Sequence, residues 1–322
     1  MSANQTLQVR VARKALEAED IVTLELVAAD GGALPPFSAG SHIDVHLPGQ
    51  LVRQYSLCND PQETQRYQIA VLREAASRGG SRAVHDSVRE GDVLTIGAPR
   101  NHFALAHEAR SHLLLAGGIG ITPLLCMAER LAQLGADFTL HYATRSPART
   151  AFRARIAAAP WAQRAHFHFD DGAAAQKLDI AAVLERPDAG THLYVCGPRG
   201  FMEAVLQTAR AQGWAESNLH YEFFGAEVGP TDGDSAFEVQ LASSGRVITV
   251  PKDQSVTQAL AAAGVEIMVS CEQGVCGTCL TRVLEGVPDH RDSYLTPEER
   301  AANDQFTPCC SRSKTPRLVL DL

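Results

Sequence analysis

Five of the eight cysteines in the chain fall between Cys271 and Cys310. Cys271, Cys276 and Cys279 have the spacing C-x4-C-x2-C, and Cys309 follows much later. This is the ligand spacing of [2Fe–2S] clusters of the plant type, because two irons need four thiolates that converge on a small inorganic core. Disulfides or a zinc site are the alternatives, but structural zinc sites more often combine two Cys-x2-Cys pairs. The spacing therefore predicts one [2Fe–2S] cluster.

Either of two adjacent residues, Cys309 and Cys310, could supply the fourth thiolate. The tripeptide Thr-Pro-Cys309 is similar to the Leu-Thr-Cys segment near the end of plant-type ferredoxins, and this resemblance makes Cys309 the predicted ligand. Cys310 is then expected to be a buried hydrophobic side chain. Gly274 and Gly277 would let the backbone approach the cluster and direct N–H groups at its sulfurs. The predicted metal ligands are Cys271, Cys276, Cys279 and Cys309.

Two short motifs in the first hundred residues could bind a phosphate group. Arg53-Gln54-Tyr55-Ser56 contains an arginine, whose planar guanidinium can donate two hydrogen bonds to a phosphate at once. A glycine turn at the expected start of a helix offers backbone N–H groups to the same kind of ligand. An exposed arginine near a strand tyrosine would be the ordinary explanation of the first motif. The glycine turn consists of Gly79, Gly80, Ser81 and Arg82.

A glycine-rich loop directly follows a predicted strand and precedes a predicted helix. This is the context of a dinucleotide-binding loop, because glycines permit close approach of a pyrophosphate. Thr122 could cap the helix. A plain turn would rarely need three glycines, so we expect a nicotinamide dinucleotide at this loop. The candidate residues are Gly117, Gly118, Gly120, Thr122 and Pro123.

These motifs lie on elements of two kinds. Short β-branched segments with period-two patterning, interrupted by one helix near Ser81, predict an antiparallel barrel or sandwich in the first hundred residues. From Ser111 onward, strands alternate with alanine-rich helices, which predicts a parallel sheet covered by helices. The expected strands are 7–11, 21–27, 42–47, 67–72 and 92–96, then 112–115, 138–142, 165–169 and 192–196; the expected helices are 123–134, 150–158, 180–184 and 201–212.

The segment 226–236 is rich in Gly, Asp and Pro and is the predicted interdomain linker. Two strand-like segments, 237–241 and 246–250, and a helical segment, 256–264, precede the cysteine loop. Thr296-Pro-Glu-Glu299 predicts a capped helix start. The expected domains are 1–106, 107–228 and 229–322.

The composition is that of a globular protein, with 45% hydrophobic and 20% charged residues and a formal net charge of −8. Lys and Arg are scattered, so we expect neither nucleic acid nor an anionic membrane as a partner. The longest apolar run, 113–128, is broken by glycines and a proline and is too short to span a membrane. The N-terminus shows no secretory signal, so a cytoplasmic location is expected.

Arg53-Gln54-Tyr55-Ser56 resembles the Arg-x-Tyr-Ser motif of the ferredoxin reductase superfamily. The resemblance implies that Arg53 pairs with the flavin phosphate and that Tyr55 and Ser56 lie against the isoalloxazine ring. The same resemblance includes two further sequence elements. It implies that the candidate catalytic residues are Ser56, Cys196 and Phe224.

One of these elements, Cys196-Gly197-Pro198, resembles the Cys-Gly-Pro element beside the nicotinamide, although by itself it would be only a turn. The other, Phe224 in the run 221–225, resembles the aromatic residue that covers the flavin. A phenylalanine pair in the core would explain that run equally well.

Taken in order, the motifs resemble the phthalate dioxygenase reductase family, which includes the reductase components of vanillate-type demethylases, over essentially the whole chain. The resemblance implies an antiparallel β-barrel flavin domain, an α/β parallel-sheet nucleotide domain and a β-grasp plant-type [2Fe–2S] ferredoxin domain. It implies FMN rather than FAD, NADH as donor and a separate Rieske oxygenase as acceptor. No residue excludes an adenosine half on the flavin.

The choice between NADH and NADPH depends on the residues after the strand 138–142. Arg145, Ser146 and Arg149 could accept the 2′-phosphate of NADPH, or they could form a solvated basic loop. Asp170 and Asp171 after the next strand would disfavour a phosphate, so NADH is the first choice.

NADH gives up a hydride, whereas a [2Fe–2S] cluster accepts one electron at a time, so a flavin must lie between them. A free-standing flavin or quinone reductase would not require the ferredoxin domain. A redox-sensing protein would not need a hydride pathway, and the sequence shows no DNA-binding motif. We therefore expect an NADH-dependent reductase that supplies electrons to an oxygenase.

Overall fold

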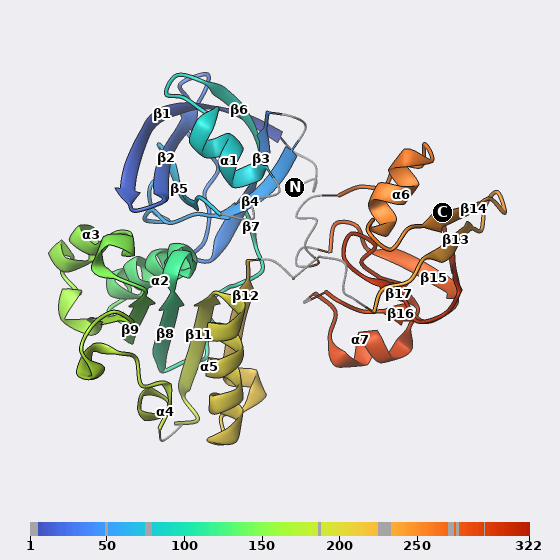
Figure 1. Ribbon diagram of the computed structural model, residues 1–322. Helices are drawn as coiled ribbons and strands as arrows, with labels where there is room; N and C mark the ends of the chain where they lie inside the picture. The colour runs from blue at the N-terminus through green and yellow to red at the C-terminus, as the bar shows by residue number, and fades with distance from the viewer. Residues whose placement is uncertain are drawn as a thin grey trace. The chain divides into compact units, whose positions relative to one another are not determined.

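The computed structural model describes residues 6–48, 51–74, 79–185, 188–224, 233–269, 274, 277–292 and 294–322. The chain divides into two compact units, Met1–Glu222 and Phe223–Leu322, which Figure 1 shows as ribbons. Among the described residues, no helix is both long and apolar enough to cross a membrane.

The N-terminal unit begins with an antiparallel sheet, called the barrel below, in the order β4-β3-β6-β1-β2-β5. Strand β7 pairs with β3. Helix α1 contacts β3, β4 and β5. All five expected strands of this region are confirmed, but the sequence pattern does not predict β4, because Arg53 and Gln54 interrupt its apolar alternation. The bounds are β1 Thr6–Ala18, β2 Ile21–Ala28, β3 Ser41–Leu47, β4 Leu51–Ser56, β5 Tyr67–Leu72, α1 Gly80–Asp86, β6 Val93–Gly97 and β7 Arg100–Asn101.

The same unit continues with a five-stranded sheet in the order β10-β9-β8-β11-β12. Strands β8, β9, β10 and β11 run parallel, and β8 and β11 are buried along nearly their whole length, as expected for a sheet covered on both faces. The strands are β8 Ser111–Gly117, β9 Asp137–Thr144, β10 Ala165–Phe169, β11 Thr191–Gly197 and β12 Leu219–Phe223. The helices are α2 Ile121–Gln133, α3 Arg153–Ala158, α4 Ile180–Val183 and α5 Arg199–Ala211, and the 3-10 turns are η1 Gly118–Gly120, η2 Pro147–Arg149, η3 Ala162–Arg164, η4 Ala174–Gln176 and η5 Glu216–Asn218.

One apolar core is shared by the two sheets of the N-terminal unit. Buried side chains of the first sheet region, including Ile21, Cys58 and Phe103, pack in the same cluster as Leu124 of α2 and Tyr194 of β11. Figure 1 shows α2 on the side of the parallel sheet that is nearest the barrel. The barrel and the α/β region therefore form one compact unit, and the expected boundary at residues 106 and 107 remains a prediction.

The C-terminal unit contains a mixed sheet in the order β14-β13-β19-β15-β17. Strand β13 is antiparallel to β14 and parallel to β19. The predicted helix start at Thr296 is confirmed: Thr296 and Glu299 form a reciprocal capping box for α7. The bounds are β13 Phe237–Leu241, β14 Val247–Val250, α6 Val256–Ala262, β15 Thr281–Glu285, β16 Pro288–Asp289, α7 Pro297–Ala302, β17 Gln305–Phe306, β18 Arg312–Ser313 and β19 Arg317–Leu320.

The predicted linker, 226–236, is too long at its C-terminal end. Arg291 Nη1 donates to Oδ2 of Asp234 at 2.9 Å, and Arg312 Nη2 donates to the carbonyl of Ser235 at 3.1 Å. The Asp234 side chain is only 4% exposed. Asp234 and Ser235 therefore belong to the C-terminal unit, while residues 225–232 lie outside the described part of the chain.

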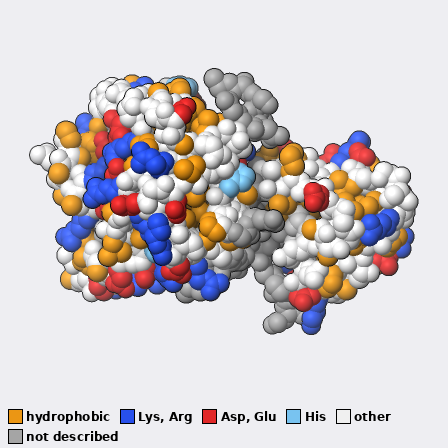
Figure 2. All heavy atoms as spheres, turned by 90° about the horizontal axis from the view of Figure 1, so that it is seen from above, with side chains coloured by type: hydrophobic (Ala, Val, Ile, Leu, Met, Phe, Trp, Pro, Cys, Tyr) orange, Lys and Arg blue, Asp and Glu red, His pale blue; other side chains and the backbone are white. Residues whose placement is uncertain are grey.

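Charged side chains of both signs are mixed on one face of the molecule. On the face presented in Figure 2, Lys and Arg lie among Asp and Glu instead of forming one continuous patch of a single sign.

Two histidine pairs link neighbouring strands of the five-stranded sheet. His141 Nδ1 lies 3.0 Å from His168 Nε2, and His192 Nδ1 lies 2.8 Å from His220 Nε2. In each pair one ring must be neutral to accept the hydrogen bond. Burial, and then the neighbouring His168 and His166, lowers the pKa of His141 to about 4.

We expect the N-terminal unit to lose stability in mild acid. A histidine whose pKa is lower in the folded than in the unfolded state stabilises the fold above the unfolded value of about 6.5, and this contribution is lost as the pH falls toward the folded value. Between about pH 7.5 and about pH 5, His141 should account for a loss of about 1 to 2 kcal/mol in the free energy of unfolding. Urea titrations at both pH values measure it.

His141→Gln should flatten this pH dependence, whereas His107→Gln, at an exposed position, should leave it unchanged. Equal acid sensitivity in wild type and His141→Gln would rule out this source of the effect.

Candidate functional site

Two of the three candidate catalytic residues, Ser56 and Cys196, interact with Glu222, which is not itself one of the candidates. The Ser56 hydroxyl at the end of β4 donates to Oε2 of Glu222 on β12 at 3.3 Å. Burial raises the pKa of Glu222 to about 7, although the hydrogen bond from Ser56 opposes this shift. Burial also raises the pKa of the Cys196 thiol, and Glu222 raises it further. A carboxyl group that titrates near neutral pH therefore lies between the flavin motif and the end of β11.

Glu222 was missed by reasoning from the sequence. It lies in an aromatic run and forms no motif of its own, and the only available signal was an acidic residue beside aromatic residues in a short strand. His42 on β3 is a further neighbour, with Nδ1 at 4.0 Å from Oε1 of Glu222. The third candidate, Phe224, follows β12 with 39% of its surface exposed, and its position over the flavin remains a prediction.

The glycine loop after β8 packs tightly against the turn after β11. A Cβ atom at Gly120 would lie 2.2 Å from the carbonyl oxygen of Cys196, and one at Gly197 would lie 2.9 Å from Cα of Gly117. These glycines are therefore required by the approach of two strand ends. Gly118 differs: it has a φ of +51°, and a Cβ there would meet no atom within 4 Å among the described residues. It is the glycine of this loop with open space in front of it.

Thr122 does not cap α2 as expected. The N-cap residue is Gly120, and the Thr122 hydroxyl donates to the carbonyl of Ile119 at 3.1 Å. The helix begins two residues earlier than the hydrophobic pattern predicts, because Pro123 is accepted in the first turn, where its missing N–H costs no intrahelical hydrogen bond. Thr122 and Pro123 are both buried. Pro198, the last residue of the Cys-Gly-Pro element, is the N-cap residue of α5.

The two candidate phosphate-binding motifs lie side by side. A Cβ atom at Gly80 would lie 2.6 Å from Cγ of Arg53, so the arginine stem passes directly over the start of α1. Gly79 has a φ of +93°, a conformation that favours glycine. The Arg53 guanidinium donates to the carbonyl of Val52 at 2.7 Å, and Arg82 is exposed. A phosphate group could thus be held by the arginine and the glycine turn together.

The rest of β4 is fixed within the barrel. Gln54 Nε2 donates to Oδ1 of Asp44 at 3.1 Å, and Ser81 accepts a hydrogen bond from the Glu74 amide at 3.2 Å. Burial raises the pKa of Tyr55, so its hydroxyl stays protonated. The strand therefore offers Tyr55 and Ser56 as neutral groups to a bound ring.

In the C-terminal unit, Cys279 and Cys309 are buried in one cluster together with Cys310. The other two predicted ligands, Cys271 and Cys276, lie outside the described residues. Gly274 and Gly277 both have a φ of +69°, and a Cβ at Gly277 would lie 2.3 Å from Cζ of Tyr294. These buried thiols and tight glycine turns fit a cluster held by thiolates.

Cys310 is buried as expected, but its surroundings are more polar than a hydrophobic side chain requires. Its Sγ lies 3.1 Å from Oγ1 of Thr307 and 3.7 Å from Oγ of Ser311. Hydrogen bonds, the strongest with Cys309, lower the pKa of Cys310. The choice of Cys309 as the ligand remains a prediction.

Comparison with protein-family models gives two matches. Residues 239–314 match the 2Fe-2S iron-sulfur cluster binding domain, which supports the cluster assignment. Residues 98–219 match the N-terminal domain of proteins similar to the dimethylamine monooxygenase subunit DmmA.

The similarity to known proteins extends over both units. The chain is 54% identical to the vanillate O-demethylase oxidoreductase of Pseudomonas sp. (strain HR199 / DSM 7063), over 98% of this chain and 100% of that protein. It is 59% identical to the Pseudomonas putida protein of the same name, over 95% of this chain and 96% of that protein. A structure of phthalate dioxygenase reductase, described as modular for electron transfer from pyridine nucleotides to [2Fe–2S], matches with a TM-score of 0.82 and 39% identity, over 99% of this chain and 98% of that chain. The chain therefore belongs to the phthalate dioxygenase reductase family, the oxidoreductases that serve as reductase components of oxygenase systems.

Proposed function

We propose that this protein takes a hydride from NADH, divides it into single electrons and delivers them to a partner oxygenase of the Rieske type. The observation that carries the proposal is that one chain combines the Ser56–Glu222–Cys196 site with the buried pair Cys279 and Cys309. FMN would supply the change from two-electron to one-electron chemistry.

Each candidate group of residues has a role in this proposal. Arg53 and the turn Gly79–Arg82 would hold the FMN phosphate, and Tyr55 and Ser56 would lie along the ring. The open space at Gly118 would admit the nucleotide. Cys196, Gly197 and Pro198 would form the wall beside the nicotinamide, and Phe224 would cover the flavin.

Glu222 would act on the charge of the nicotinamide. Loss of a hydride leaves the nicotinamide ring positive, and a carboxylate preorganised nearby stabilises that charge. Ser56 holds the carboxyl group in place through its hydrogen bond.

The partner's substrate would bind to the oxygenase and not to this chain. The relatives named vanillate O-demethylase oxidoreductase support an oxygenase that acts on a methoxylated aromatic compound as the first partner to test. The docking face would surround the cysteine loop of the C-terminal unit.

The ion pairs of Arg149 favour NADH over NADPH. Its guanidinium pairs with the carboxylate of Glu19 and, at 2.9 Å, with Oδ2 of Asp20. An arginine already neutralised by two carboxylates gains less from the 2′-phosphate of NADPH, which those carboxylates would also repel.

The cysteine assignment is tested by paired substitutions. In Cys309→Ser, we expect loss of the visible absorbance of the cluster and a fall of at least about tenfold in cytochrome c reduction by NADH, because the one-electron exit is lost. Direct reduction of ferricyanide by the flavin should persist, which controls for damage to the N-terminal unit. Cys310→Ser should keep the cluster. The reverse pattern would make Cys310 the ligand, and unchanged cytochrome c reduction in both would contradict the proposed electron route.

The nucleotide preference is tested by kcat/KM with each nucleotide. Wild type should favour NADH, and the double variant Glu19→Gln/Asp20→Asn should raise kcat/KM for NADPH by about three- to tenfold through the released Arg149. Asp188→Asn, which removes the exposed ion pair with Arg110, is the matched control. A wild-type preference for NADPH would overturn the choice of NADH.

The role of Glu222 predicts a pH profile. Because its pKa lies at about 7, the carboxylate is formed as the pH rises, and the rate constant of flavin reduction by NADH should increase about two- to tenfold between about pH 6 and about pH 8. Stopped-flow measurements on Glu222→Gln should give a flat, lower profile, whereas Glu203→Gln on the surface should behave as wild type. A Glu222→Gln profile that still rises would assign the titration to another group.

A further inference from the structure

A short segment of the α/β region, η2 through α3 (residues 147–158), is attached to the barrel at several points. The Glu19 amide donates to the carbonyl of Ala148 at 2.9 Å, and the Phe152 amide donates to Oε1 of Glu17 at 2.8 Å. Phe152 has a φ of +59°, which turns the chain into α3. This segment therefore connects two regions whose alignment the proposed hydride transfer requires.

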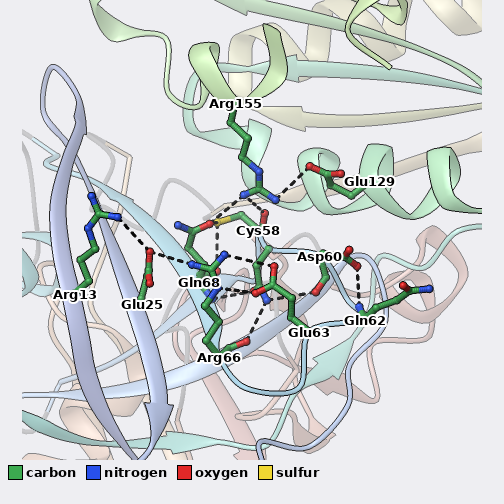
Figure 3. A network of polar contacts seen from close by, with 11 residues as sticks. Arg13, Glu25, Cys58, Asp60, Gln62, Glu63, Arg66, Gln68, Glu129 and Arg155 are labelled. Carbon is green, nitrogen blue, oxygen red and sulfur yellow. Dashed lines mark hydrogen bonds and ion pairs between the residues drawn. The ribbon is translucent and has the colours of Figure 1, made fainter. Parts of the chain in front are cut away.

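Within this segment, Arg155 reaches three different elements (Figure 3). Its Nη1 donates to the carbonyl of Cys58 at 3.1 Å and to Oε1 of Gln68 at 3.0 Å. Its Nη2 donates to Oε1 of Glu129 at 3.3 Å. Oε2 of Glu129 accepts a further hydrogen bond from Trp161 Nε1 at 3.4 Å, so the carboxylate is held from both sides.

The barrel end of this connection lies next to the flavin motif. Cys58 is fully buried and follows Ser56 after one residue. The Leu57 amide donates to the carbonyl of Ser41 at 2.8 Å and the Cys58 amide to the carbonyl of Gln68 at 2.9 Å, so the backbone here has little freedom. A displacement of the Cys58 carbonyl would therefore be expected to move Ser56, which lies two residues before it.

The other end lies on the helix that follows the glycine loop. Glu129 belongs to α2, and α2 begins directly after Gly120, the residue in close contact with the Cys196 carbonyl. A rigid helix transmits a displacement at Glu129 to that loop. Arg155 thus joins the strand that carries Ser56 to the helix that supports the nicotinamide side of the site.

We propose that Arg155 is a positioning residue that sets the alignment of the nicotinamide with the flavin ring. The inference rests on the proposed function, because it concerns the step in which a hydride, two electrons with one proton, passes from NADH to the flavin and leaves NAD+. Arg155 touches neither reacting group; it acts through the Cys58 backbone and through Glu129.

The geometry requires arginine in particular. The guanidinium is planar and donates from two nitrogens in fixed directions, so one side chain can satisfy a carbonyl, an amide oxygen and a carboxylate together. A lysine ammonium could replace the positive charge, but it could not donate from two nitrogens in fixed directions. The apolar core that includes Cys58, Leu124 and Phe152 does not contain Arg155, so we expect the loss of Arg155 to affect alignment more than folding.

The experiment compares Arg155→Gln, Arg155→Lys and a matched control. Arg66 is the control because it lies in the same polar network but pairs, among the described residues, only with residues of the barrel, Glu63 at 2.6 Å and Glu25 at 3.0 Å. Anaerobic stopped-flow with NADH gives the limiting rate of flavin reduction, the apparent Kd and the charge-transfer absorbance that precedes reduction. Hydrogen exchange of the amides at residues 57 and 58 in flavin-free protein gives a readout independent of activity.

For Arg155→Gln we expect a limiting rate lower by on the order of tenfold to a hundredfold, with a smaller change in apparent Kd, weaker charge-transfer absorbance and faster exchange at residues 57 and 58. Arg155→Lys should recover part of the rate. Arg66→Gln should match wild type in all four measurements, and thermal melting of each variant checks the fold.

A limiting rate in Arg155→Gln equal to wild type, or lowered no more than in Arg66→Gln, would overturn the inference. A limiting rate in Arg155→Lys equal to that of wild type would also overturn it, because the planar guanidinium would then be unnecessary. If Arg155→Gln does not fold, the decision rests on Arg155→Lys alone: partial loss supports the proposal and an unchanged rate overturns it. Failure of wild type to be reduced by NADH would instead refute the proposed function.

Discussion

The apolar core shared by the barrel and the five-stranded sheet is the constraint on which the N-terminal unit depends. Burial of apolar surface is the main favourable term in folding, and here the same side chains serve both sheets. The barrel therefore cannot shift against the sheet without exposing that core. A site built from β4 on one side and β11 and β12 on the other can consequently be held in a fixed geometry, as the Ser56–Glu222 hydrogen bond indicates.

The elements could be predicted where one physical pattern dominated. The segment 67–72 matches β5 at both ends because a short, mostly apolar run is bounded there by polar residues. Strand β4 has no such alternation, since it carries the charged and polar side chains of the flavin motif at partly exposed positions. The linker was predicted too long because composition alone cannot show that Asp234 forms ion pairs with two arginines much later in the chain.

The candidate site was predictable in its motifs but not in its contacts. Glycine spacing indicates a nucleotide loop, yet only the structure distinguishes Gly120 and Gly197, which let two strand ends meet, from Gly118, which faces open space. Arg155 has no local signature, and Glu222 has only that of an acidic residue in an aromatic run, because the partners of both residues are distant in sequence. Long-range polar contacts of this kind remain outside the reach of local pattern reasoning.

The anchoring of Asp234 by Arg291 and Arg312 has a consequence for the modularity of the protein. The described part of the C-terminal unit has an apolar core of its own, and Arg291 and Arg312 hold Asp234 by ion pairs. A natural or engineered gene fusion could therefore join another electron-transfer partner ahead of this residue without rebuilding either core. A joint placed after Asp234 would instead remove the ion pairs that hold this residue in the C-terminal unit.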